Sequence, residues 1–216
     1  GIRAALGEAA AALEKLLRTF DAGRVVREGI DTVIVGSPNV GKSTLMNCLS
    51  GCERSIVTPI AGTTRDIVEE TVRLGDVLLR LADTAGIRET GDTVESIGVQ
   101  RARDRLEQAA LVLVLFDGSR PLGRDDLALI RETSGQAAIA VINKADRQFE
   151  IDLPYIQSRY QHTVVISAAS GEGLDALEEA VRQITGVQAL DEAEPLLATE
   201  RQRDCTRRCL QNVREA

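Results

Sequence analysis

The residues whose types and spacing most directly indicate chemistry form the stretch Gly36 to Ser43, which reads GSPNVGKS. It fits the pattern G-x-x-x-x-G-K-[ST], in which the backbone N–H groups of a glycine-rich loop surround an anion. The apolar run at 32–35 is typical of a buried strand, and residues 43–50 have a helical pattern. Because a helix N-terminus adds partial positive charge, the sequence predicts a phosphate site in which Lys42 reaches the β- and γ-phosphates and Ser43 holds Mg²⁺. The alternative is a glycine turn that holds no ligand.

A second polar group follows another apolar strand, in the stretch DTAG that begins at Asp83 and ends at Gly86. A carboxylate at that strand end contacts Mg²⁺ through water, and the Gly86 backbone N–H can approach a γ-phosphate closely. Thr63 and Thr64 lie in a polar loop before the predicted strand at 67–74, and one hydroxyl there could complete the Mg²⁺ shell. The alternative for this pair is a turn, which threonines in loops also form.

A third motif, NKAD at 143–146, indicates which base is bound. The Asp146 carboxylate can accept hydrogen bonds from the N1–H and the N2 amine of guanine, whereas adenine offers neither and would leave the carboxylate unpaired. Such a site discriminates by a factor of roughly 10⁴ or more. The stretch Ser167 to Ala169 would place a backbone N–H near the guanine O6. NKAD alone could be a helix-entry loop, but these motifs in this order at strand ends predict a guanine-nucleotide site.

The residue that would activate the attacking water does not follow the usual pattern. Ras-like enzymes have a glutamine directly after the glycine of the second motif, but this chain has Ile87, which cannot orient water. The nearby candidates are Arg88, Glu89, Asp92 and Glu95, each of which is otherwise a solvated charge in a loop. Glu95 is a candidate because the water needs a carboxylate within hydrogen-bond reach.

Alternating patterns over 31–186 predict the elements that position these motifs. The predicted strands are 31–36, 67–74, 76–83, 110–116, 137–143 and 162–167. The predicted helices are 43–50, 95–108, 124–134, 151–158 and 173–185. Gly75-Asp76 is a hairpin signal, so one strand should be antiparallel at the sheet edge. The others are separated by helices and should be parallel, which places their ligand at the carboxyl ends of the strands.

The two ends of the chain are predicted to be helical, so we divide it into a helical segment (1–28), a nucleotide-binding domain (29–187) and a C-terminal helical segment (188–216). The first stripe, within 2–20, comprises Ile2, Leu6, Ala9, Leu13, Leu16, Leu17 and Phe20. The second comprises Leu196, Leu197, Cys205, Cys209, Leu210 and Val213. Since an apolar stripe must be buried, we expect the ends to pack together, beside the central domain or on protein outside this chain.

Composition narrows the class of protein. The 216 residues are 44% hydrophobic and 27% charged, with a net charge of −7, so an extended nucleic-acid surface is not expected. With two Tyr, three Phe and no Trp, a base-stacking platform is not expected either. The apolar run 109–116 is too short to span a membrane, and the first residues show no signal-peptide pattern, which predicts a cytoplasmic protein.

The four cysteines form two i, i+4 pairs, Cys48 with Cys52 and Cys205 with Cys209. A metal site would need further ligands, and the one histidine, His162, lies in another region. Reduced, structural cysteines are therefore expected.

Several of these stretches together resemble the G domain of the MnmE (TrmE) family of tRNA-modification GTPases. The resemblance lies in Asn39 and in GTTRD at 62–66, DTAGIRE at 83–89 and VESIG at 94–98. It extends to AGRVVREG at 22–29 and ATERQR at 198–203. It implies an α/β fold: a Ras-like P-loop GTPase domain with a mostly parallel six-stranded sheet, one antiparallel edge strand and flanking α-helical segments.

The resemblance also implies a potassium-dependent GTPase that G-domain dimerisation in the GTP state activates. Potassium ligands would come from Asn39, Thr58, Ile60 and Thr63, and Thr64 would join Ser43 on Mg²⁺. Glu95 would position the attacking water. The family installs an aminomethyl-type group on the wobble uridine of tRNA with an FAD-containing partner protein, and tRNA would be bound by the full-length assembly alone.

Together, these arguments predict a set of site residues and cofactors. The predicted catalytic residues are Lys42, Arg88 and Glu95. The predicted residues for GTP or GDP, Mg²⁺ and K⁺ are Asn39, Val40, Gly41, Lys42, Ser43, Thr44, Thr58, Ile60, Thr63, Thr64, Asp83, Gly86, Asn143, Lys144, Asp146, Ser167, Ala168 and Ala169.

The chain departs from the family pattern at both ends. Family members carry an N-terminal folate-binding domain and end in a Cys-Ile-Gly-Lys motif, which Cys205 and Cys209 do not match. The alternative function is a binding switch in ribosome assembly, as in the Era and Der families, which share the phosphate loop and base motifs. An ATP-using kinase or ATPase is disfavoured by Asp146.

Overall fold

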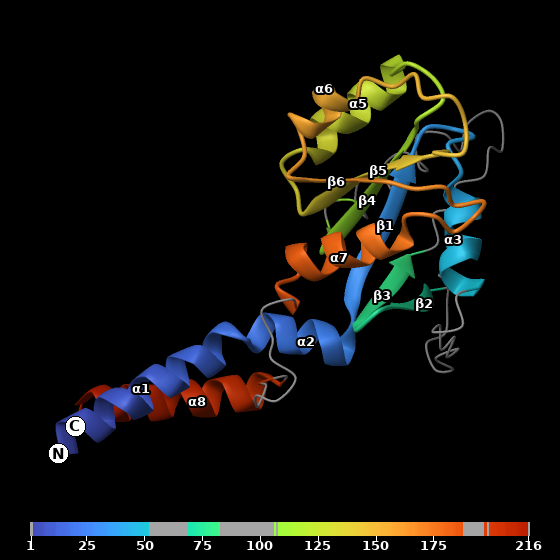
Figure 1. Cartoon of the computed structure of the whole chain (residues 1–216). Helices are drawn as coiled ribbons and strands as arrows, with labels where there is room; N and C mark the ends of the chain where they lie inside the picture. The colour runs from blue at the N-terminus through green and yellow to red at the C-terminus, as the bar shows by residue number, and fades with distance from the viewer. Residues whose placement is uncertain are drawn as a thin grey trace, which may run out of the picture. The chain divides into compact units, whose positions relative to one another are not determined.

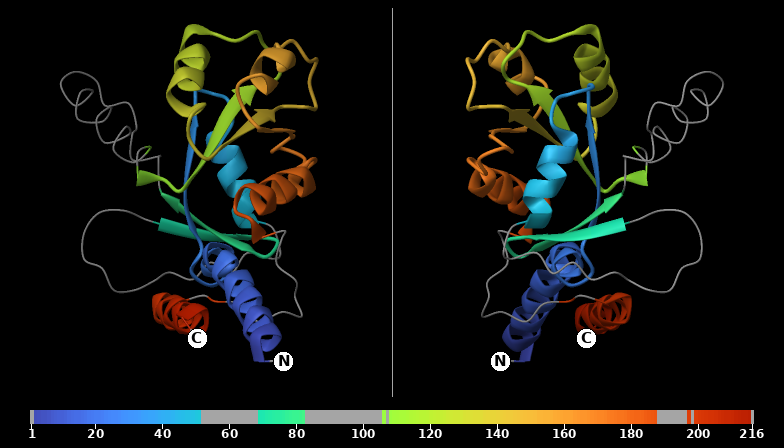
Figure 2. Two further views of the ribbon diagram at one scale, coloured as in Figure 1. Left: turned by 90° about the vertical axis from the view of Figure 1, so that its left-hand side faces the viewer. Right: turned by 90° about the vertical axis from the view of Figure 1, so that its right-hand side faces the viewer.

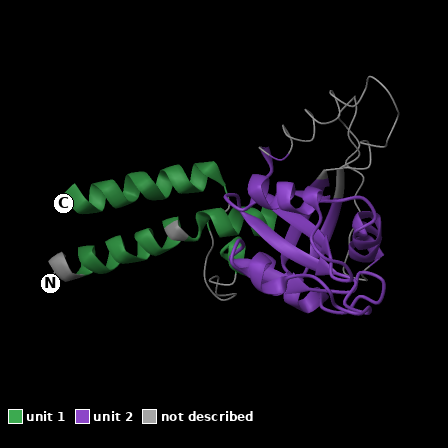
Figure 3. Ribbon diagram, turned by 90° about the horizontal axis from the view of Figure 1, so that it is seen from above, with its two compact units in different colours: residues 1–29, 182–216 green, residues 30–181 purple. Residues whose placement is uncertain are grey.

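The computed structural model describes residues 2–51, 69–82, 106, 108–187, 197 and 199–215. The chain divides into two compact units, one formed by 1–29 with 182–216 and the other by 30–181 (Figure 3). The larger unit carries the sheet, the phosphate loop and the NKAD motif.

The larger unit is built on one six-stranded sheet in the order β2-β3-β1-β4-β5-β6 (Figure 1). Its strands are β1 (Ile30–Gly36), β2 (Glu69–Leu74), β3 (Val77–Ala82), β4 (Leu111–Asp117), β5 (Ala138–Asn143) and β6 (His162–Val165). β2 pairs antiparallel with β3 across the turn at Gly75, and all other pairs are parallel. The prediction of a mostly parallel six-stranded sheet with one antiparallel edge strand is confirmed.

Helices cover both faces of this sheet (Figures 1 and 2). They are α3 (Lys42–Gly51), α5 (Arg124–Thr133), α6 (Leu153–Gln157) and α7 (Leu174–Ile184). Each lies within a few residues of its predicted range, whereas the helix predicted at 95–108 falls largely outside the described residues. α5 and α6 lie on one side of the sheet, and α3 and α7 lie on the other.

The core explains why β4 reads as an uninterrupted apolar run. All seven residues of β4 are buried, as expected for a central strand covered on both faces. Alternate residues of β4 and β5 form one cluster with side chains of α5 and α6. That cluster includes Val112, Val114, Phe116, Ala140, Ile142, Ile130, Ile156 and Tyr160. A rigid sheet of this kind fixes the positions of the loops at its edge.

The smaller unit contains α1 (Ile2–Arg18), α2 (Phe20–Glu28) and α8 (Glu200–Glu215). α1 and α8 lie side by side, with the two chain ends at the same end of the pair (Figures 1 and 3). Arg214 Nη2 donates to Glu14 Oε1 at 2.8 Å, and the Arg203 guanidinium lies 5.0 Å from the Phe20 ring centroid. The expectation that the two ends pack together is confirmed.

Two details of the end segments were predicted wrongly. The stripe at 2–20 is not one helix, because α1 ends at Arg18 and a second helix, α2, begins at Phe20 and buries Phe20, Ala22 and Gly23. In α8, Cys205 and Cys209 are exposed, and the buried residues are Thr206 and Leu210. Leu210 is buried as predicted, but the residue one turn before it on the buried face is Thr206 and not Cys205. Leu196 lies outside the described residues.

In the part of the chain that the structure describes, every helix is too short or too polar to cross a membrane.

Candidate functional site

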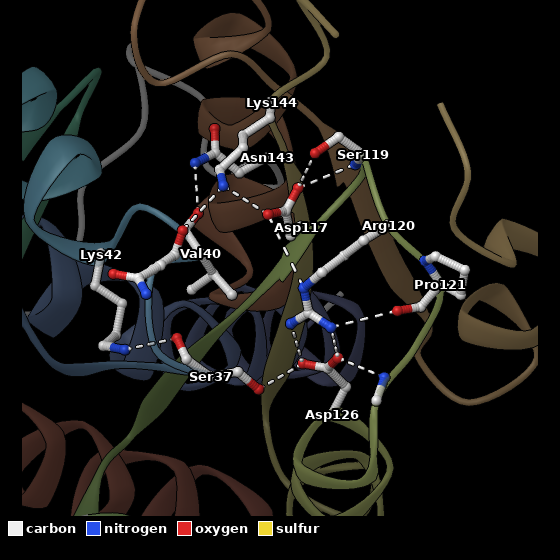
Figure 4. A network of polar contacts seen from close by, with 12 residues as sticks. Ser37, Val40, Lys42, Asp117, Ser119, Arg120, Pro121, Asp126, Asn143 and Lys144 are labelled. Atoms are coloured by element: carbon white, nitrogen blue, oxygen red, sulfur yellow. Dashed lines mark hydrogen bonds and ion pairs between the residues drawn. The ribbon is translucent and has the colours of Figure 1, made fainter. Parts of the chain in front are cut away.

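Four loops meet where the parallel strands β1, β4, β5 and β6 end, and three of these loops carry predicted motifs. The phosphate loop follows β1, NKAD begins at the last residue of β5, and Ser167 lies just after β6. The fourth loop, after β4, begins at Asp117, and its side chains face the phosphate loop (Figure 4). The sheet therefore brings together residues that are up to 130 positions apart, at the edge where ligands of such folds bind.

The phosphate loop has the backbone that the pattern requires. Asn39 has a φ of 62° and Gly41 a φ of 101°, both in the left-handed region. A Cβ atom on Gly41 would lie 2.4 Å from Asn143 Nδ2, so both its φ and its surroundings demand glycine. α3 begins directly afterwards, and the loop therefore presents its N–H groups and the helix N-terminus to the same space.

Lys42 lies folded over this loop. Its Nζ donates to Gly36 O at 2.7 Å and to Ser37 O at 3.0 Å. Burial lowers the pKa of the Lys42 ammonium. Ser43 and Thr44, in the first turn of α3, are exposed, whereas the Val40 side chain is fully buried and can offer only its backbone to a ligand.

Asn143 joins three of the four loops. Its side chain is buried, and its Nδ2 donates to Val40 O at 2.8 Å while its Oδ1 accepts from Ala168 N at 2.9 Å. Lys144 has a φ of 68°, and its Nζ donates to Asn39 O at 2.9 Å. The base motif and the phosphate loop are thus one hydrogen-bonded structure (Figure 4).

The Asp146 side chain is exposed to solvent, as a carboxylate that recognises a base must be before the base binds. Ser167 Oγ donates to Asp146 Oδ1 at 2.7 Å. This hydrogen bond lowers the pKa of the Asp146 carboxyl, which keeps the group anionic. Ala169 is exposed beside it.

Sequence reasoning missed the loop after β4 and treated 118–123 only as a connection. In the structure, Asp117 Oδ2 pairs with Lys144 Nζ at 2.5 Å, and Ser119 donates to Asp117 Oδ1 from both its backbone N–H and its hydroxyl. Burial by itself would raise the pKa of the Asp117 carboxyl, but the hydrogen bonds from Lys144 and Ser119 outweigh this effect and lower it. The sequence feature that could have indicated this role is a carboxylate, Asp117, at the carboxyl end of a buried strand.

A second missed carboxylate, Asp126, lies in the first turn of α5. It accepts from Ser37 Oγ at 2.6 Å and from Arg120 Nη1 at 2.8 Å. Asp126 therefore connects α5 to the phosphate loop, and Arg120 connects Asp126 to Asp117 in the loop after β4 (Figure 4). No local pattern indicated this pairing, because Ser37 and Asp126 are 89 positions apart.

Part of the predicted site lies outside the described residues. This holds for Thr58, Ile60, Thr63, Thr64, Asp83, Gly86, Arg88 and Glu95, and for the family-specific stretch 94–98. Their assigned roles stay predictions. The structure does bring together the described members of the set, from Asn39 to Thr44, from Asn143 to Asp146 and from Ser167 to Ala169.

Comparison with known proteins agrees with this geometry. The family model described as 50S ribosome-binding GTPase matches residues 31–144. The tRNA modification GTPase MnmE of Natranaerobius thermophilus is 44% identical over 190 residues, which are 87% of this chain and 42% of that protein. The protein of the same name from Geobacter metallireducens is 46% identical over 180 residues, 83% of this chain and 39% of that protein. The chain thus spans about two fifths of the length of these curated relatives.

Solved structures share the fold of the larger unit. Era of Aquifex aeolicus, solved with GDP.AlF4-, is 33% identical with a TM-score of 0.53, covering 77% of this chain and 58% of that chain. The G domain of the T. maritima FeoB iron transporter is 26% identical with a TM-score of 0.53, covering 72% of this chain and 98% of that chain. The chain therefore belongs to the 50S ribosome-binding GTPase family, in which its similarity over most of its length places it among the MnmE proteins.

Proposed function

We propose that this chain binds guanine nucleotide with Mg²⁺, hydrolyses GTP in a potassium-dependent reaction activated by pairing of two G domains, and serves tRNA wobble-uridine modification in the full-length protein. The observation that supports nucleotide binding most strongly is the junction of the phosphate loop and the base motif through Asn143, whose amide bonds Val40 O at 2.8 Å. One rigid structure then holds both ends of a nucleotide.

Recognition of guanine is assigned to Asp146. Ser167 fixes one carboxylate oxygen at 2.7 Å and keeps the group charged, so its orientation toward the N1–H and N2 amine of guanine is set before binding. A backbone N–H of the 167–169 stretch would meet the O6. Because adenine would leave this carboxylate unpaired, the site should prefer guanine by roughly 10⁴ or more.

The phosphates are assigned to the N–H groups of the loop, to Lys42 and to Ser43. The Lys42 ammonium rests on two carbonyl oxygens, at 2.7 and 3.0 Å, and can move to phosphate oxygens without crossing the protein. The Ser43 hydroxyl is exposed at the helix N-terminus, where it would hold Mg²⁺ with Thr64. Mg²⁺ and K⁺ would supply positive charge against the charge that develops on the phosphates.

The potassium role is assigned to Asn39 together with Thr58, Ile60 and Thr63. Lys144 Nζ binds the Asn39 carbonyl at 2.9 Å, which fixes the backbone of this residue in its left-handed conformation. The Asn39 side chain is exposed and its amide oxygen is a suitable ligand for a hard cation. Glu95 would position the attacking water, and Arg88 is the other candidate near it.

The proposed partners come from the resemblance to the MnmE family, and the relatives are named for tRNA modification. We propose a homodimer through the G domains, an FAD-containing partner protein, and tRNA binding by the full-length assembly alone. The ribosome-assembly switch is not favoured, because the relatives at 41–46% identity carry the MnmE name.

The test is GTP turnover at equal ionic strength in KCl and in NaCl, for the parent chain and for Asn39→Gly. Glycine keeps the left-handed backbone and removes the amide, so we expect the parent to be about tenfold or more faster in KCl and the variant to lose that stimulation. Asn47→Ala, at an exposed position of α3, is the matched control and should keep the stimulation. Equal parent rates in the two salts would remove the potassium role, and absence of GTP binding by calorimetry would remove the whole proposal.

A further inference from the structure

A buried carboxylate lies against the phosphate loop and is not part of the proposed chemistry. Asp126 is only 2% exposed, and both its oxygens have partners. Oδ1 accepts from Ser37 Oγ at 2.6 Å and from Arg120 Nη2 at 3.3 Å. Oδ2 accepts from Arg120 Nη1 and from Gly123 N, both at 2.8 Å. A charge this deeply buried is tolerated because every lone-pair direction is used.

Ser37 is held at two atoms. Its hydroxyl donates to Asp126, and its carbonyl oxygen accepts from Lys42 Nζ at 3.0 Å. Ser37 is itself buried, 7% exposed, and directly follows the first glycine of the loop. Asp126 therefore sets the place of the residue on which the phosphate-binding lysine rests.

The same loop is held at a second point through the same arginine. Arg120 pairs with Asp126 at 2.8 Å and its Nε lies 4.0 Å from Asp117 Oδ2. Asp117 in turn holds Lys144, whose Nζ binds Asn39 O. Two carboxylates bridged by one arginine thus fix both ends of the turn between Ser37 and Asn39.

We propose that Asp126 is a positioning residue for the phosphate loop, which it holds through Ser37 in the conformation that receives nucleotide phosphates. The proposal rests on the proposed nucleotide site and deepens it, because it connects α5 to that site. A purely structural role is the competing explanation, since Asp126 also caps α5 by accepting from Gly123 N. That role predicts lost stability with unchanged nucleotide binding.

The experiment removes the link and keeps the cap. Ser37→Ala deletes one hydroxyl and leaves the bonds of Asp126 to Gly123 and Arg120. The matched control is Tyr160→Phe, which breaks another buried hydrogen bond of 2.6 Å, to Thr133, in the same unit and away from the loop. GDP affinity by calorimetry, KM and kcat for GTP, and thermal stability are measured on the full chain at a temperature where all variants are folded.

We expect Ser37→Ala to weaken GDP binding and raise the KM for GTP by about tenfold, with kcat changed less than about threefold, because the loop loses the hydrogen bond that holds it in its binding conformation, and this cost falls equally on the ground state and the transition state. Tyr160→Phe should lower stability by a similar amount and leave the GDP affinity unchanged. In a double-mutant cycle, Asp126→Asn added to Ser37→Ala should change GDP affinity by less than about threefold, since the link is already broken.

Amide hydrogen exchange without nucleotide gives an independent result. Ser37→Ala should speed exchange at 39–42 and leave β4 unchanged, whereas Tyr160→Phe should leave 39–42 unchanged. Parental GDP affinity and parental exchange at 39–42 in Ser37→Ala would overturn the inference and leave Asp126 as a helix cap. If the parent chain does not bind GDP at all, the proposed function fails, and exchange alone then decides whether Asp126 holds the loop.

Discussion

Replacing Asn143 with alanine tests the junction at the centre of the site. The Asn143 side chain is 3% exposed and satisfies two buried backbone groups, Val40 O at 2.8 Å and Ala168 N at 2.9 Å. Alanine removes both partners at a buried position, so Val40 O and Ala168 N lose the groups that satisfy them. The phosphate loop would then lose its direct connection to the loop after β6.

The size of the effect follows from the two orphaned groups. A buried backbone donor or acceptor left without a partner costs about 1–3 kcal/mol, so Asn143→Ala should lower the free energy of unfolding by about 2–6 kcal/mol. This is a large share of the roughly 5–15 kcal/mol that a natural domain has. At about 2–4 °C per kcal/mol for a domain of this size, the melting temperature should fall by roughly 4–24 °C.

The assay is urea unfolding of the nucleotide-free chain, which separates the loss of packing from the loss of ligand. The midpoint should fall with an unchanged m-value, since the folded surface is the same. Asn47→Ala, at an exposed asparagine of α3, is the control and should stay within about 0.5 kcal/mol of the parent. A stability of Asn143→Ala within about 1 kcal/mol of the parent would refute the reasoning, because it would mean that the two backbone groups find other partners.

Three further predictions concern the same edge of the sheet. Asp146→Asn should weaken GTP binding by roughly 10⁴-fold and improve xanthosine triphosphate binding, since an amide N–H can donate to the O2 of xanthine; titration with both nucleotides measures this. Gly41→Ala should abolish nucleotide binding in calorimetry, because its Cβ would lie 2.4 Å from Asn143 Nδ2 at a φ of +101°, whereas Gly7→Ala, where a Cβ meets nothing within 4 Å, should be neutral or stabilising. Asp126 contributes stability at neutral pH: burial alone would raise the pKa of its carboxyl, but hydrogen bonds from Ser37, Gly123 and Arg120 lower it below the unfolded value of about 3.9. That contribution is present above about pH 4 and lost as the pH falls through the folded pKa, so the stability difference between parent and Asp126→Asn should shrink in acid unfolding curves.

The fold was predictable because its determinants are local and periodic. β4 and β5 are continuous apolar runs between polar loops, which is the pattern of a parallel strand covered on both faces. The glycine turn at Gly75 indicated the one antiparallel pair. The buried faces of the end helices were harder to predict. In α8 a threonine, Thr206, occupies the buried face beside exposed Cys205, and polarity alone ranks those two residues in the wrong order.

The motif residues could be located from the sequence for a related reason. Lys42, Asn143 and Asp146 sit in short recognisable motifs at strand ends, and the structure places those motifs at one edge of the sheet. The carboxylates that position them lie outside these motifs. Asp117 and Asp126 read as an ordinary loop acid and a first-turn helix acid, and only the folded sheet shows that their partners are Lys144 and Ser37.

This difference bears on how the site works. The ligand-facing groups lie on loops, where conformational freedom is greatest, and the bonds that hold them come from neighbouring loops rather than from the ligand. Asn143 ties β5 to the phosphate loop, and Asp126 ties α5 to it at Ser37. Because three separate segments must be folded before the phosphate loop is held, nucleotide affinity should depend on the integrity of the sheet edge as a whole. A positioning network of this kind transmits a change at α5 to the phosphates through two hydrogen bonds, Asp126 to Ser37 and Ser37 to Lys42, without any residue of α5 touching the nucleotide.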